Sequence, residues 1–163
     1  MRMCEIADAL SIASDTEMLV RIANRAAFRR TDHDLEGTAD PYEADTVKWG
    51  PLVDQQRVRK NYSQLMIDAQ ISYVIYSYNT PVAWWTHGSS VPYYPTMSSA
   101  PGHFASVAQA VLKKEVLTPI YTVVWENAEG KKFLAHYNDE RDRDLRIVDL
   151  VVAQKARNVR TQL

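Results

Sequence analysis

Cysteine, glycine and long apolar runs are scarce or missing in this 163-residue sequence. The only cysteine, Cys4, excludes an intramolecular disulfide and any zinc site built from several thiolates, and it favours a reducing compartment. No stretch approaches the roughly twenty apolar residues of a membrane span, and the N-terminus leads into no secretory apolar core. We therefore expect a cytoplasmic protein without membrane contact.

Common catalytic signatures are missing as well. The five glycines form no Gly-rich phosphate loop, and the sequence contains neither a G-x-S-x-G elbow nor an H-E-x-x-H motif. The formal charge of −1 argues against a protein that coats nucleic acid by bulk electrostatics. Nothing in the sequence indicates a cofactor.

What the sequence does contain is an aromatic and β-branched stretch at residues 71–96. Its alternation and its breaks predict three strands, 71–78, 82–86 and 91–96, separated by an Asn-Thr-Pro break and a His-Gly-Ser-Ser turn in which Gly88 takes a positive φ. Two prolines make the third strand an edge, and a second copy of the chain could pair with that edge in a homodimer. The sequence thus predicts a three-strand meander with aromatic side chains on both faces.

The N-terminal half is expected to be mainly helical around one acidic loop. A first helix is predicted over 3–13, and the capping-box pattern Ser14–Glu17 begins a second helix whose arginines, up to Arg30, gather at its C-terminal end. Residues 31–51 are acidic and lack periodicity, which indicates a loop. A further helix is expected over 52–70.

After the meander, the pattern predicts a helix over 103–117 and a hairpin over 120–138 that turns at Asn127–Gly130, with Gly130 in the left-handed conformation. The tail, 141–162, reads as a terminal helix, although Ile147–Val152 could equally be a strand.

The fold class predicted from these elements is α+β in a single domain, residues 1–163. It consists of helices within 3–30, the acidic loop 31–51, and a body, 52–163, built on a central antiparallel sheet. That sheet combines the meander, 71–96, with the hairpin, 120–138, and is flanked by the N-terminal helices, a helix at 102–117 and the C-terminal helix.

One acidic cluster suggests a metal. Asp32, His33, Asp34 and Glu36 are suitable ligand types, but their spacing does not match an EF-hand, whose glycine and terminal glutamate fall elsewhere. A solvated acidic loop is the preferred interpretation, and no metal site is predicted.

The segment Tyr76–Trp84, followed by a Thr/Ser-rich turn and His103, resembles a family of short uncharacterised bacteriophage proteins. Those proteins share a Y-S-Y-x-T-P-I-A segment and then a Y-S-x-T-T-x-x-H-Q segment. The first matches well here, whereas the second differs, with a later histidine and Phe104 in place of glutamine. The resemblance covers roughly residues 58–112. It implies a phage or prophage origin and an accessory role, without a known reaction.

Three functional hypotheses follow. In a hydrolase or nuclease, His103 would act as general base beside Ser98, Ser99 or Thr96. A histidine at the start of a helix beside serine caps is more often structural.

In a single-stranded nucleic-acid binder, aromatic rings of the sheet would stack on bases and a basic cluster would follow the phosphates. The rings are Tyr76, Tyr78, Trp84 and Trp85, and the basic cluster is Arg57, Arg59 and Lys60. Sheet aromatics more often form core.

The third hypothesis is non-catalytic binding of a host or phage protein, as an inhibitor or counter-defence factor, through exposed aromatics with arginine neighbours. It is preferred because it needs no catalytic constellation.

Overall fold

The computed structural model describes residues 10–100 and 102–162. The chain divides into two compact units, one comprising Met1–Trp84 and Tyr94–Val116, the other Trp85–Tyr93 and Leu117–Leu163. Among the described residues, no helix has the length and apolarity needed to cross a membrane. The α+β class with antiparallel sheets is confirmed. The single-domain organisation stays a prediction.

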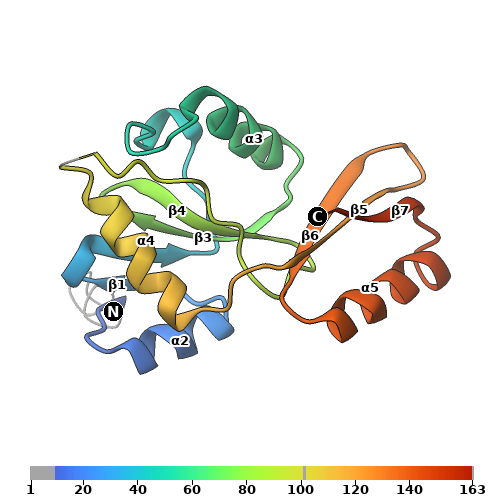
Figure 1. The fold of residues 1–163 in the computed structure, drawn as a ribbon, viewed down its shortest axis with the longest axis horizontal. Helices are drawn as coiled ribbons and strands as arrows, with labels where there is room; N and C mark the ends of the chain where they lie inside the picture. The colour runs from blue at the N-terminus through green and yellow to red at the C-terminus, as the bar shows by residue number, and fades with distance from the viewer. Residues whose placement is uncertain (1–9, 101, 163) are drawn as a thin grey trace, which may run out of the picture. The chain divides into compact units, whose positions relative to one another are not determined.

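The first unit is built on a four-stranded antiparallel sheet of order β1-β2-β3-β4. Its strands are β1 (Phe28–Arg30), β2 (Leu35–Thr38), β3 (Ile71–Ser77) and β4 (Thr80–Thr86), of which the last two residues of β4 are assigned to the second unit. Its helices are α2 (Asp15–Ala23), α3 (Gln55–Ile67) and α4 (Phe104–Glu115), with short 3₁₀ turns η1 (Asp32–Asp34) and η2 (Ala44–Thr46). Figure 1 shows the strands running between α3 above and α2 below.

Both faces of this sheet are covered, which explains its aromatic content. On one face, Tyr73 is fully buried and its hydroxyl donates to the Ala26 carbonyl just after α2, 2.6 Å away. On the other face, the hydroxyls of Tyr76 and of Tyr62 in α3 lie 2.6 Å apart. Helix α4 packs beside β3 and anchors through Gln109, whose amide donates to the Val82 carbonyl at 2.9 Å. Strands buried on both sides do not show a clean polar alternation.

Glycine is required at one position of this sheet. A methyl group on Gly37 in β2 would overlap the ring of Phe28 and the hydroxyl of Tyr73. Phe28 lies directly opposite Gly37 in the β1–β2 register, so its ring fills the space that a larger residue would need.

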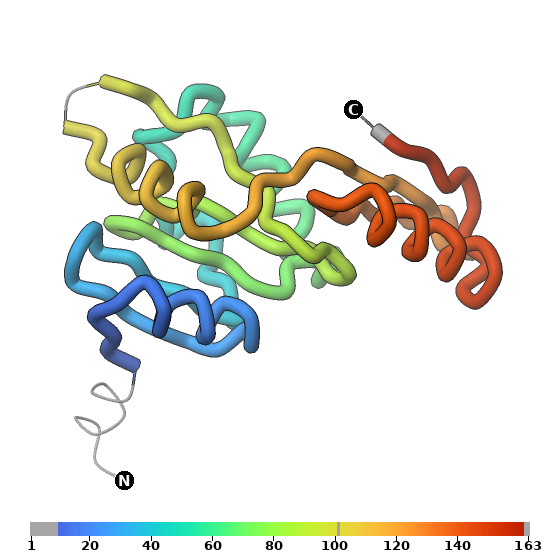
Figure 2. The backbone as a smooth tube through the Cα atoms, turned by 60° about the horizontal axis from the view of Figure 1, so that its bottom comes forward, coloured from blue at the N-terminus to red at the C-terminus, as the bar shows by residue number. Residues whose placement is uncertain are grey.

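The second unit has a three-stranded antiparallel sheet of order β6-β5-β7 with one helix packed on it. Its elements are β5 (Tyr121–Glu126), β6 (Lys132–Tyr137), α5 (Glu140–Val152) and β7 (Arg157–Gln162). Figure 2 shows α5 running alongside these strands. Leu150 of α5 is fully buried against Val123, Trp125, Ala135 and Tyr137.

Several sequence signals are confirmed. The Ser14 hydroxyl accepts from the Glu17 amide at 3.2 Å, so α2 begins at the predicted cap. Helices α3 and α4 and the β5–β6 hairpin lie where expected, and Gly88 and Gly130 have φ of 87° and 80°.

Other expectations are wrong. Residues 91–96 form no strand, because Pro92 and Pro95 cannot supply ladder donors; with no strand there, the proposed pairing edge for a homodimer does not exist. The place beside β3 is taken by β2, from the segment expected to be an acidic loop. The hairpin belongs to its own sheet instead of extending the first one.

The chain ends also differ from expectation. Residues 28–30 are strand β1, so Arg29 and Arg30 do not extend the end of a helix. The tail is helical over α5 and then forms the unexpected strand β7. The helix predicted over 3–13 lies mostly outside the described residues, and Ser11 is in a bridge with Arg29 instead of a helix.

Candidate functional site

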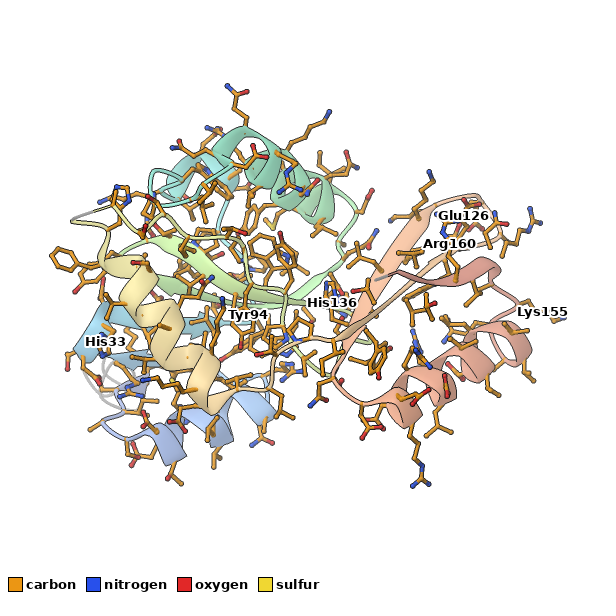
Figure 3. The ribbon with its side chains drawn as sticks, in the orientation of Figure 1. His33, Tyr94, Glu126, His136, Lys155 and Arg160 are labelled. Carbon is orange, nitrogen blue, oxygen red and sulfur yellow. The ribbon has the colours of Figure 1, made fainter. Side chains whose placement is uncertain are left out.

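The candidate site lies at one end of the four-stranded sheet, where three segments meet. Leu35 pairs with Ser77, so η1, which precedes β2, and the β3–β4 turn, which follows β3, emerge at the same end. The Ser77 hydroxyl ties them together by donating to the His33 carbonyl at 2.7 Å. Helix α4 contacts both η1 and β3, and His33 is seen beside α4 in Figure 3.

Backbone strain is concentrated at this sheet end. Of the eight non-glycine residues with positive φ in the described chain, four lie here: His33 (61°), Asp34 (47°), Tyr78 (48°) and Asn79 (63°). Such conformations disfavour side chains with a Cβ, and bulky residues most of all. Strained residues cluster at binding and catalytic sites, so an observed outlier motivates a functional hypothesis.

The two-residue β3–β4 turn, Tyr78–Asn79, is held firmly. Positive φ at both positions is the geometry that suits the twist of a hairpin, and Asn is well adapted to it whereas Tyr is not. The Asn79 side chain donates to the Thr46 carbonyl at 2.5 Å, and the Asn79 carbonyl accepts from the Lys48 amide at 2.8 Å. Tyr78 is therefore presented on a fixed backbone.

An exposed aromatic pair crowns this turn. The rings of Tyr78 and Phe104 have centroids 5.9 Å apart, and the residues are 45% and 64% exposed. Val107, one helical turn after Phe104, is 51% exposed. We call these three residues the turn–helix patch. It is an apolar surface on a rigid frame, and Phe104 was not singled out from the sequence.

The predicted catalytic residues do not assemble. His103 stands just before α4, and among the described residues its buried Nδ1 has no hydrogen-bond partner. The Ser98 hydroxyl accepts from the Ala100 amide at 3.2 Å, and Ser99 and Thr96 are exposed. A nucleophile–base pair needs a hydrogen bond between the two groups, which the described part of the chain does not provide.

Three of the four predicted stacking residues belong to the core. Tyr76, Trp84 and Trp85 are 1%, 2% and 1% exposed. The Tyr76 hydroxyl also accepts from the Tyr42 amide at 2.9 Å, and burial raises the pKa of Tyr76. Trp84 packs edge-on against Tyr62, with ring centroids 5.7 Å apart. These rings cannot act as exposed platforms for bases, and only Tyr78 remains from the predicted set.

The predicted basic cluster is partly neutralised. Arg57 pairs with Asp54 at 2.8 Å, and Arg59 pairs with Asp45. Lys60 is exposed on the same helix, α3. Because two of the three cations sit against carboxylates, the cluster offers little net charge to a phosphate backbone.

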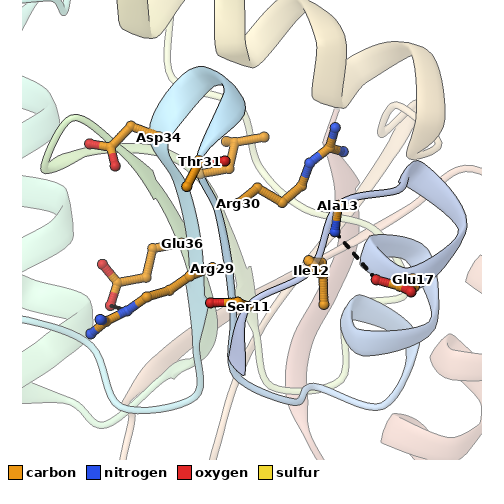
Figure 4. Close-up of a pocket in the computed structure, with 10 residues that line it drawn as sticks. Ser11, Ile12, Ala13, Glu17, Arg29, Arg30, Thr31, Asp34 and Glu36 are labelled. Carbon is orange, nitrogen blue, oxygen red and sulfur yellow. Dashed lines mark hydrogen bonds and ion pairs between the residues drawn. The ribbon is translucent and has the colours of Figure 1, made fainter. Parts of the chain in front are cut away.

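A pocket of about 630 Å³ lies beside the sheet end, between the Ser11–Glu17 segment and residues 29–36 (Figure 4). Its charged groups bind one another. Arg29 lies 3.8 Å from Glu36, and the Glu17 carboxylate accepts from the Ala13 amide at 3.3 Å. Arg30, almost buried, pairs with Asp32 and with Asp15 at 2.6 Å, and the hydrogen bond to Asp32 raises its pKa.

These pairings also explain the fate of the acidic cluster. Asp32 is engaged by Arg30, while Glu36 accepts from the Tyr42 hydroxyl and lies near Arg29. Within residues 10–100 and 102–162, no group of three or more His, Cys, Asp or Glu side chains is placed to hold a metal ion.

The second unit contains a buried histidine that the sequence did not reveal. The His136 Nδ1 lies 3.0 Å from the Thr122 hydroxyl, and burial lowers the pKa of His136 to about 4 (Figure 3). The Ser89 hydroxyl accepts from the His136 amide at 2.8 Å and lies 2.8 Å from the Thr86 hydroxyl, which donates to the Leu134 carbonyl. With these bonds made, Ser89 fastens the Thr86–Ser89 turn to β6 and is a structural group instead of a nucleophile.

Comparisons with known proteins add no identification. No protein-family model matches the chain, and neither the curated proteins nor the solved structures contain a match. The interpretation of the turn–helix patch rests on its geometry.

Proposed function

We propose that this chain is a small accessory protein of the phage type, which acts in the host cytoplasm by binding a host or phage protein without catalysis. Inhibition of that partner, as a counter-defence factor would achieve, fits a binder of this size. The resemblance of the Tyr76–Trp84 segment to short phage proteins supports the setting.

One observation carries the proposal: the exposed Tyr78–Phe104 pair stands on a strained turn that hydrogen bonds hold in place. Rigid aromatic side chains are the commonest anchors of protein interfaces, and truncating one typically costs about 2 kcal/mol or more of binding energy. A fixed turn lowers the ordering cost of binding. The alternatives lack comparable support, since Tyr76, Trp84 and Trp85 are buried and His103 is not joined to a serine among the described residues.

The test is affinity capture from bacterial lysate with matched variants. The wild-type protein is compared with the double variant Tyr78→Ser, Phe104→Ser and with Ile67→Ser, a control that removes an apolar side chain 77% exposed on α3. We expect a protein that is retained by wild type and by the control and is lost from the double variant. Circular dichroism and melting temperature verify that all three proteins fold.

Equal retention by all three proteins would contradict the proposal. A labelled single-stranded oligonucleotide distinguishes the main alternative: if it binds with a steep salt dependence and the double variant loses that binding, the patch serves nucleic acid instead of protein.

A further inference from the structure

Helix α5 in the second unit carries an apolar stripe on its outer side. Leu145, Val148 and Val152 follow one another at helical spacing and are 58%, 58% and 71% exposed, and Val151 beside them is 52% exposed. The inner side is already used, because Leu150 is fully buried in the core of the unit. A helix with apolar residues on both sides has one side available for another molecule.

The charges around this stripe are arranged asymmetrically. The guanidinium groups of Arg143 and Arg146 fold inward over the rings of Tyr121 and Trp125, 4.6 and 5.4 Å from the ring centroids. They are also paired with carboxylates of α5 itself. At 100° per residue, Asp144 borders the stripe on one side and Asp142 and Asp149 border it on the other, while Arg141 continues it at the N-terminal end.

We propose that this acid-bordered stripe docks an amphipathic helix of another protein, one whose apolar face is flanked by lysine and arginine. Apolar anchors at i, i+3 and i+7 are the pattern of helix-to-groove and helix-to-helix recognition. Basic flanks on the partner would complement the carboxylates on both sides of the stripe.

Two other occupants fit less well. In a two-fold symmetric antiparallel pair of α5 helices, the same flank faces itself, so Asp142 and Asp149 would meet the copy's Asp142 and Asp149. A membrane surface prefers amphipathic helices with lysine and arginine on the polar side, whereas α5 presents carboxylates there. The basic amphipathic helix is the occupant that the charges favour.

The expected contact is small. The 13 residues of α5 span about 20 Å, so a single docked helix buries less than the roughly 1,200–2,000 Å² of a stable standard interface. The interaction is therefore of the transient class, with a dissociation constant in the micromolar range.

The experiment uses the full chain and a fluorescein-labelled helical peptide of leucines and lysines in amphipathic spacing, read out by fluorescence anisotropy. A leucine–glutamate peptide of the same pattern is the charge control. We expect the leucine–lysine peptide to bind the wild type, Leu145→Ser with Val148→Ser to weaken binding about tenfold or more, and Asp142→Asn with Asp144→Asn to weaken it severalfold and reduce its salt dependence. Val53→Ser, which removes a side chain 62% exposed in the first unit, should bind as the wild type does.

Four results would overturn the inference. They are the absence of peptide binding, equal binding of the leucine–glutamate peptide, stripe variants that bind like the wild type, and a Val53→Ser loss as large as that of the stripe variants. Sedimentation of a stripe-dependent dimer of the chain, or stripe-dependent binding to anionic vesicles, would replace the proposed partner by a second copy or a membrane. None of these readouts involves Tyr78 or Phe104, so this inference and the proposed function fail independently.

Discussion

Replacing Tyr78 by asparagine should make the protein more stable and less able to bind. A left-handed backbone costs a side chain with a Cβ about 1–2 kcal/mol, and asparagine tolerates it best. Against this gain stands the lost contact with Phe104, which is at the lower end of the roughly 0.5–1.5 kcal/mol of an aromatic pair because Tyr78 is 45% exposed. The expected net change is a stabilisation of about 0.5–1 kcal/mol.

The same replacement removes one of the two aromatic anchors of the turn–helix patch. If the proposed function is correct, the affinity for the captured protein falls about 30-fold, which corresponds to roughly 2 kcal/mol. Stability is measured by urea unfolding and affinity by titration with the purified partner. Tyr78→Phe serves as control, because it keeps the ring and the strain and should change neither quantity.

Two results would refute this reasoning in different ways. A destabilisation by more than about 1 kcal/mol would mean that the Tyr78 ring is retained for packing. A more stable Tyr78→Asn variant that binds with unchanged affinity would mean that the strained turn is not part of the interface.

Three further predictions concern stability. Gly37→Ala should destabilise by about 1–3 kcal/mol in urea unfolding because its methyl overlaps buried side chains, whereas Gly50→Ala, whose methyl meets open space, should change little; equal effects would contradict the close packing. Tyr94→Phe removes a buried hydroxyl without a partner among the described residues and should be neutral or stabilising, whereas Tyr76→Phe should cost about 1–3 kcal/mol because its hydrogen-bonded neighbours lose their partner; the reverse order would refute this. Because the pKa of His136 is lowered from 6.5 to about 4, the unfolded chain takes up its proton first: stability should be full above pH 6.5 and fall by up to roughly 3 kcal/mol towards pH 4, and His136→Gln should flatten this part of the pH profile of the melting temperature.

The elements that the sequence predicted well are those that local chemistry determines. Ser14 and Glu17 cap α2, Gly130 supplies the left-handed position of the β5–β6 turn, and α4 has a regular apolar stripe. Strands β1, β2 and β7 were missed because they are short, polar and stabilised by partners elsewhere in the chain. The pairing of Leu35 with Ser77, for example, joins an acidic segment to a distant strand, and no local pattern encodes it.

Burial explains why the predicted site was mostly wrong in its membership. Aromatic residues alternate along β3 and β4, and the sequence could not show that helices cover both faces of the sheet. Trp84 and Trp85 are therefore core, although they looked like the strongest stacking candidates. The available signal was the position of Tyr78 in the two-residue link between the strands, where the alternation ends and a side chain must face solvent.

The choice of the turn–helix patch over other surfaces depends on where local preferences are violated. Most of the described chain is locally consistent, with capped helices and glycine where tight turns need it. At the sheet end the preferences are broken together: a bulky tyrosine occupies a turn position suited to asparagine or glycine, and Phe104 opens α4 with its ring exposed. Chain reversal alone would be achieved more cheaply by Asn-Gly, and packing alone would bury the rings. What Tyr78 and Phe104 add, and what those cheaper solutions would lose, is an aromatic surface held rigid in solvent, which is the property that an interface anchor needs.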